Sequence, residues 1–232
     1  MIRGTKTPEH ASMDESMELP GLQRLLEVCQ RLHLGLETSP PAREPLKAGG
    51  ILEGVPFDPI LASVYARLGH AVFAANAMCW TLMQSDDKDH SLQEHNKWWR
   101  ENHWEELGEP VIVFGGATFT YATVPSLADD QGRQPVVQVN TYEFDGLHVM
   151  PVASNVDRFF HSYSHYLEAL VAHPHYQQTG ETELTFPWDA TETLARDERL
   201  VELMRAGRFD ALMKNEDDVT RRWAAKVMGS RA

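Results

Sequence analysis

Cysteine is scarce in this chain, which has only Cys29 and Cys79 among its 232 residues. Both lie in apolar stretches, and neither belongs to the C-x-x-C spacing that is typical of redox and metal-binding motifs. Two cysteines are also too few for a disulfide framework. We therefore expect two buried free thiols rather than a redox pair.

The chain also lacks a long hydrophobic run. Its longest apolar stretch, AVFAANAMCWTLM at residues 71–83, is interrupted by Asn76, whereas a membrane-spanning helix needs about 20 apolar residues. Residues 1–20 contain no apolar segment of the kind found in secretory signals. We therefore expect a soluble, cytoplasmic protein that makes no membrane contact.

Basic residues are outnumbered, because 21 Lys and Arg residues stand against 34 Asp and Glu residues, giving a formal charge of −13. This excess repels phosphate backbones, so direct binding of nucleic acid is not expected. The densest basic cluster, Arg221–Arg222, lies among acidic residues. Two explanations of the acidity stay open, namely simple solubility and fast encounter with a basic partner.

Motifs of catalysis are missing as well. The chain has no G-x-x-x-x-G-K-[ST] loop, no G-x-G-x-x-G and no G-x-S-x-G, and Gly115–Gly116 is interpreted as a turn between strands. The paired acids Asp86–Asp87 and Asp129–Asp130 lie in polar turns, where an exposed carboxylate stays ionised and suits a contact better than acid–base chemistry. We expect no enzyme and no cofactor.

Two kinds of hydrophobic periodicity alternate along the chain. Apolar residues recur with a helical period over residues 22–32, 58–68, 91–107 and 154–171, and with a strand period over residues 111–116, 118–125, 135–142 and 147–153. Residues 70–83 predict a buried strand or pair of strands. Residues 37–50, with three prolines and two glycines, predict a connector. The fold class is therefore α+β, with an antiparallel or mixed sheet of four or more strands packed with helices.

The same pattern divides the chain into three parts. Residues 1–18 are polar and lack periodicity, so they predict a flexible arm. Residues 19–173 form the α+β domain. Residues 174–232 predict an acidic helical extension that packs on the domain, with helices near residues 197–207 and 216–229.

The helix predicted at residues 154–171 carries two histidines four residues apart. His161 and His165 share one face, which is a spacing that zinc hydrolases use. The H-E-x-x-H motif needs glutamate after the first histidine, but Ser162 stands there. The sequence offers no convincing third ligand, although His173 and His175, just past the helix end, could approach in space. Surface histidines that face water are the favoured interpretation, and a metal site is the alternative. Ahead of them, Ser154 is predicted to cap the helix.

Tryptophan is concentrated in the helix predicted at residues 91–107. Trp99 shares a buried stripe with Leu92 and Leu107, whereas Trp98 and Trp104 fall on the two flanks of that stripe. Core packing and an interface role stay open for these side chains, because exposed tryptophans are favoured anchors at protein interfaces.

The order of these elements is similar to that of the SUKH superfamily, which joins yeast cell-wall assembly regulators with bacterial toxin-immunity proteins. Gly54–Val55–Pro56 precede a helix, Phe114–Gly115–Gly116 close a strand, and the last strand runs through Ala153–Ser154 into a helix with Phe159–Phe160. The resemblance covers residues 19–172. The family usually has an Asn-Gly pair after its first core helix, where this chain has Leu68–Gly69–His70.

The resemblance implies a non-catalytic protein-binding domain. Bacterial members are typically immunity proteins that neutralise a toxin, often a nuclease, from the same locus, and an acidic surface suits a basic toxin. The candidate contacts are Asp86, Asp87, Asp89, Trp98, Trp104, Glu143 and Asp145. Two alternatives remain, a regulatory scaffold like the eukaryotic members and a metal-dependent hydrolase that uses His161 and His165.

Overall fold

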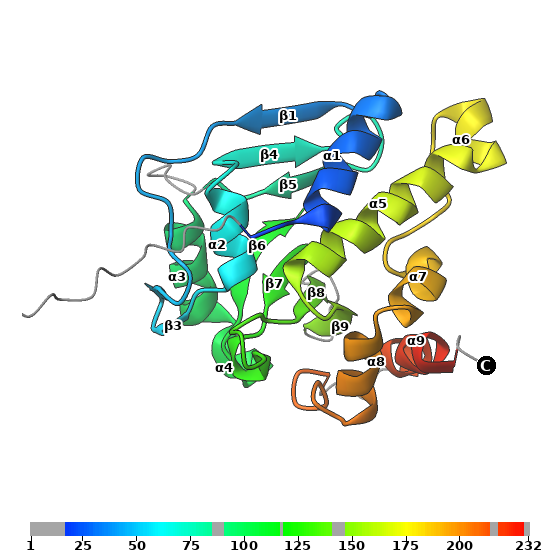
Figure 1. Ribbon diagram of the computed structural model, residues 1–232. Helices are drawn as coiled ribbons and strands as arrows, with labels where there is room; N and C mark the ends of the chain where they lie inside the picture. The colour runs from blue at the N-terminus through cyan, green and yellow to red at the C-terminus, as the bar shows by residue number, and fades with distance from the viewer. Residues whose placement is uncertain (1–16, 85–90, 117, 141–146, 214–217, 230–232) are drawn as a thin grey trace, which may run out of the picture.

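The computed structural model describes residues 17–84, 91–116, 118–140, 147–213 and 218–229 (Figure 1). Its centre is a seven-stranded antiparallel sheet with the strand order β1-β4-β5-β6-β7-β8-β9. The strands are β1 (Leu36–Ser39), β4 (His70–Phe73), β5 (Trp80–Leu82), β6 (Ile112–Gly116), β7 (Thr120–Thr123), β8 (Val136–Asn140) and β9 (His148–Ala153). A separate hairpin pairs β2 (Ile51–Leu52) with β3 (Val55–Pro56). The predicted α+β fold class is confirmed.

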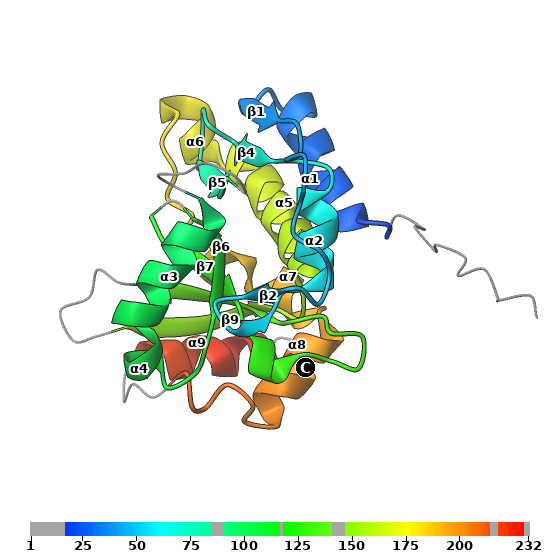
Figure 2. The ribbon, with the colours of Figure 1, turned by 90° about the vertical axis from the view of Figure 1, so that its left-hand side faces the viewer.

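Helices lie on both sides of this sheet. They are α1 (Pro20–Arg31), α2 (Pro59–Tyr65), α3 (Leu92–Asn102), α4 (Trp104–Leu107), α5 (Val156–Ala172), α6 (Pro174–Thr179), α7 (Thr191–Ala195), α8 (Glu198–Arg205) and α9 (Asp218–Gly229), with short 3-10 turns at η1 (Pro125–Leu127) and η2 (Trp188–Ala190). Helices α1 and α5 pack side by side, and Figure 2 places α3 and α4 across the strands from them. None of the helices among the described residues is long and apolar enough to cross a membrane.

The prediction that residues 37–50 form only a connector is wrong at their start, where the structure has strand β1. It pairs with β4 along the edge of the sheet, from Leu36 opposite Phe73 to Ser39 opposite His70. The local sequence is polar and runs into two prolines, which is tolerated because an edge strand needs only one hydrogen-bonding side. Pairing with a strand that lies more than thirty residues further along the chain therefore overrides the local signal.

An aromatic cluster fills the space between the sheet and α5. Trp80 lies at its centre, with ring centroids 5.4 Å from Phe159, 5.6 Å from Phe73 and 5.7 Å from Phe160. Gly115 lies in β6 rather than in the predicted turn, and a Cβ atom added there would lie 2.3 Å from the Trp80 ring. A glycine at this position is thus what lets the indole lie flat on the neighbouring strand.

Carboxylates at helix starts connect distant parts of the chain. Asp58 is buried, caps α2 through the N–H of Leu61 at 2.8 Å, and accepts the N–H of Gln134 at 2.7 Å. Burial raises the pKa of Asp58 to about 6 despite these hydrogen bonds. Asp157 accepts the N–H groups of Gly21 and Leu22, both at 3.0 Å, and so caps α1 from the first turn of α5.

The predicted cap of α5 is wrong by one residue. Asn155, not Ser154, caps α5 by accepting the N–H of Arg158 at 3.0 Å. The backbone N–H of Ser154 instead donates to Asp197 at 2.7 Å, and Asp197 also caps α8 through the N–H of Leu200 at 3.2 Å. This carboxylate therefore joins the end of β9 to the C-terminal helices.

The C-terminal helices α8 and α9 pack against the β9 edge of the sheet, and α7 packs against α9 and α5 (Figure 1). Phe186, in the segment before α7, adds its ring to the aromatic cluster at 5.4 Å from Tyr163. Trp223 of α9 is buried against Trp188 at a ring distance of 6.3 Å. Of the cysteines, Cys29 is buried as predicted and Cys79 is half-buried, and both are free thiols. The C-terminal extension therefore contributes side chains to the same hydrophobic core as residues 19–173.

Candidate functional site

The structure describes only part of the predicted contact set. Asp86, Asp87, Asp89, Glu143 and Asp145 lie outside the described residues. Trp98 and Trp104 are described, and they lie on α3 and α4 respectively.

Trp98 lies on the outer face of α3, where 50% of the residue is exposed. Its ring centroid is 4.9 Å from that of His103 and 6.1 Å from that of Trp99, both in edge-on arrangements. Trp99 is buried, and its indole N–H donates to Nε2 of His95 at 2.9 Å. Of the two roles left open for Trp98, its exposure argues against simple core packing, and the neighbouring rings limit the positions that its side chain can take.

The histidine beneath Trp98 is electrically neutral. Burial lowers the pKa of His95, and the indole of Trp99 can only donate, so Nε2 of His95 must carry no proton. The proton of the neutral ring therefore lies on Nδ1.

Trp104 is less exposed than a continuous helix over residues 91–107 predicts. It is half-buried, and its indole N–H donates to the carbonyl oxygen of Val111 at 3.1 Å. The reason is a break at His103, whose φ of −129° ends α3 before α4 begins. This break turns Trp104 toward the strand entry at β6, where it supports the fold.

Exposed acids flank Trp98 on α3. Glu94 and Glu101 lie four residues before and three residues after it, so they share its face of the helix. Residues 84–109 contain eight acids and three bases. One of the bases, Arg100, lies 2.7 Å from Glu53 of the β2–β3 turn and 3.8 Å from Glu101. We call Glu94, Trp98 and Glu101 the Trp98 surface; it combines apolar area with negative charge.

The α3 helix is held firmly beside the sheet. Asn96 is fully buried, and its side-chain amide donates to the carbonyl oxygen of Val113 and accepts the N–H of Val113, at 2.8 and 2.7 Å. The side chain of Asn96 thus makes the two hydrogen bonds to Val113 of β6 that a neighbouring strand would otherwise make. The Trp98 surface is therefore presented by a helix whose position is fixed.

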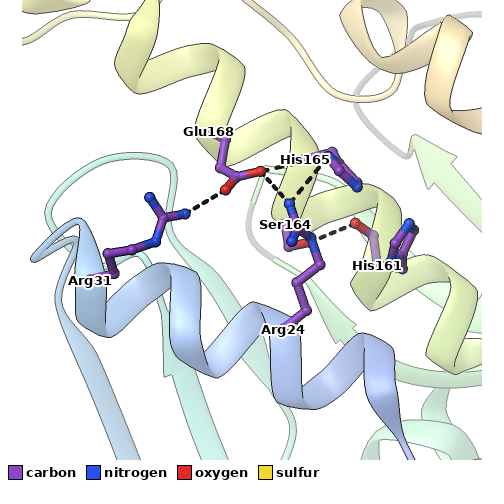
Figure 3. A network of polar contacts seen from close by, with 6 residues as sticks. All are labelled: Arg24, Arg31, His161, Ser164, His165 and Glu168. Carbon is purple, nitrogen blue, oxygen red and sulfur yellow. Dashed lines mark hydrogen bonds and ion pairs between the residues drawn. The ribbon is translucent and has the colours of Figure 1, made fainter.

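The predicted histidine pair lies at the contact between α1 and α5. Figure 3 shows Arg24 and Arg31 of α1 reaching Glu168 of α5, with Arg24 beside His165, 3.4 Å from its Nδ1. Both His161 and His165 are half-buried. The prediction that they face water holds only in part, because both side chains are half-buried where α1 packs across this face of α5.

The surroundings of these histidines oppose a bound cation. Burial is the largest cause that lowers the pKa of His161, followed by the charges of His165 and Arg24. Burial and then Arg24 lower the pKa of His165, partly offset by Glu168. Arg24 would also repel a metal ion placed at this pair. Within the described ranges, no group of three His, Cys, Asp or Glu side chains is placed to hold a metal.

Comparisons of the chain with protein-family models, with curated protein sequences and with solved structures find no match.

Proposed function

We propose that this protein is a non-catalytic, cytoplasmic immunity protein of the SUKH type, which binds a basic toxin from the same locus and blocks it. The single observation that carries the proposal is the half-exposed Trp98, presented among acids on a fixed helix. Tryptophan at the centre of an interface, with charged groups at the rim, is the usual arrangement of binding energy in protein complexes.

The negative charge of the chain supports a mechanism in which this protein covers the substrate-binding surface of the toxin. A nuclease holds its substrate with a positively charged cleft, and this chain carries a formal charge of −13. Glu94 and Glu101 would compete with nucleic-acid phosphates for such a cleft, while Trp98 supplies apolar contact that phosphates lack. The bound toxin would then be unable to reach its substrate.

The test is protection of growing cells. Cells that express the toxin gene of the same locus should survive when they also express this protein, and they should die without it. Survival should depend on Trp98, so Trp98→Ala should protect less although it folds. If the folded protein leaves killing by the toxin unchanged, the proposal is contradicted. If the protein instead binds several host proteins and no toxin, the scaffold alternative is favoured.

A further inference from the structure

A cavity of about 380 Å³ lies between the α+β domain and the C-terminal helices, away from the Trp98 surface. Three segments that are distant in sequence contribute arginines to it. Arg133 comes from the turn after η1, Arg158 from the first turn of α5, Arg196 from the end of α7 and Arg199 from the first turn of α8. Four arginines around one hollow are unexpected in a chain in which acids outnumber bases by 13.

Two of these guanidinium groups lack a counter-ion. Within the part of the chain that the structure describes, neither Arg158 nor Arg196 has an ion pair, and both side chains are exposed at the rim. Arg199 lies 3.9 Å from Glu202, which is a loose pairing. Arg133 is fixed more tightly, because Asp129 accepts its Nε–H at 2.7 Å.

The acids that line the cavity do not neutralise these cations fully. Asp129 is engaged with Arg133, and the oxygens of Asp197 accept the backbone N–H groups of Ser154 and Leu200. Glu198 also borders the cavity and is exposed. The guanidinium groups of Arg158 and Arg196 therefore remain available to contact a ligand, while the charges of Asp197 and Glu198 lower the net positive charge of the cavity.

A backbone dipole adds to the same field. Asn155, the cap of α5, and Asp197, the cap of α8, both line the cavity. The start of the 17-residue α5 has a neutral cap and so adds partial positive charge to the cavity, whereas the carboxylate of Asp197 offsets the dipole of the 8-residue α8. The dipole of α5 acts together with the four arginines.

We propose that this cavity binds a phosphorylated small molecule through its phosphate groups. Planar guanidinium groups match phosphate oxygens in paired hydrogen bonds, and Arg158 and Arg196 are the cavity arginines that have no ion pair among the described residues. The volume lies within the range of small-molecule pockets, while few apolar side chains line it, so charge provides the recognition. This site goes beyond the proposed function and does not depend on it.

The ligand would also join two parts of the chain. Arg133 and Arg158 belong to the segment that resembles a SUKH domain, whereas Arg196 and Arg199 belong to the C-terminal extension. A bound phosphate group that contacts both pairs would hold the extension in place. The bound protein should therefore unfold at a higher temperature than the free protein.

The test is a calorimetric titration of the full-length protein with inorganic pyrophosphate at low salt. The double variant Arg158→Ser, Arg196→Ser should weaken binding by about a hundredfold, since each charge-assisted contact accounts for about tenfold. The matched control, Arg43→Ser with Arg208→Ser, removes two exposed charges outside the cavity and should leave the affinity unchanged.

Three outcomes would overturn the proposal. The wild type could fail to bind pyrophosphate, the control variant could lose as much affinity as the cavity variant, or citrate could bind as tightly as pyrophosphate. The first rejects the site, the second assigns binding to overall charge, and the third rejects phosphate as the recognised group. Thermal unfolding of each variant without ligand verifies that it is folded.

Discussion

Trp80→Ala is expected to lower the free energy of unfolding by about 4 kcal/mol, as large-to-small changes of buried aromatic residues do. Trp80 is 1% exposed and contacts aromatic rings from β4, β6, β7 and α5. The cavity left by the indole cannot collapse readily, because the sheet fixes one side of it and α5 fixes the other. Urea unfolding followed by circular dichroism measures the loss.

Two further variants make the Trp80 experiment specific. Trp98→Ala is the matched control, since it removes the same side chain from the surface and should change stability by less than about 0.5 kcal/mol. Trp80→Phe should cost much less than Trp80→Ala, because the buried indole N–H of Trp80 has no hydrogen-bond partner among the described residues. Equal losses of unfolding free energy for Trp80→Ala and Trp98→Ala would show that Trp80 is not at the centre of the hydrophobic core.

Asp197→Ala is expected to cost about 3 kcal/mol of unfolding free energy. Both oxygens of Asp197 accept backbone N–H groups, from Ser154 and Leu200, and the carboxylate is 6% exposed. Its removal leaves a buried N–H at the end of β9 without a partner and α8 without its cap, each at about 1–2 kcal/mol. Equilibrium unfolding in urea gives the loss, and faster proteolysis within the C-terminal helices should accompany it.

The control for Asp197 is Asp130→Ala, which removes an exposed carboxylate from a turn. It should leave stability within about 0.5 kcal/mol of the wild type. Asp197→Asn should lie between the two, because its amide keeps one oxygen acceptor and loses the other. A loss for Asp197→Ala no greater than that for Asp130→Ala would show that this carboxylate does not connect β9 with α8.

Local periodicity predicts most of the sheet and of the helices. The strand-like sequences at residues 111–153 predict the last four strands, although nearly all of their residues are buried rather than every second one. Helix α5 follows a single apolar face from Val156 to Leu170. Strand β1 escapes this reasoning, because its residues are polar and only its partner β4 defines it. The half-burial of His161 and His165 cannot be predicted from local periodicity either, because the helix that packs against them, α1, is far away in the sequence.

The local sequence predicts the surroundings of some of these side chains and not of others. The exposure of Trp98 follows from the helical wheel, whereas the turn of Trp104 toward β6 depends on the break at His103. The spacing of Asp157 suggests a capping box within α5, yet its carboxylate caps α1. The arginine cavity has no spacing signal at all, because its side chains come from three separate segments.

Binding to a basic toxin through the Trp98 surface is the central claim, and the toxin's affinity for two charge variants tests it most directly. Glu94→Gln with Glu101→Gln changes the Trp98 surface, whereas Glu181→Gln with Glu192→Gln removes the same charge from exposed positions elsewhere. Calorimetric titration with the toxin of the same locus should show a loss of about tenfold for the first pair at low salt, little loss for the second, and a smaller difference at high salt. Equal affinities for the two pairs would contradict the claim.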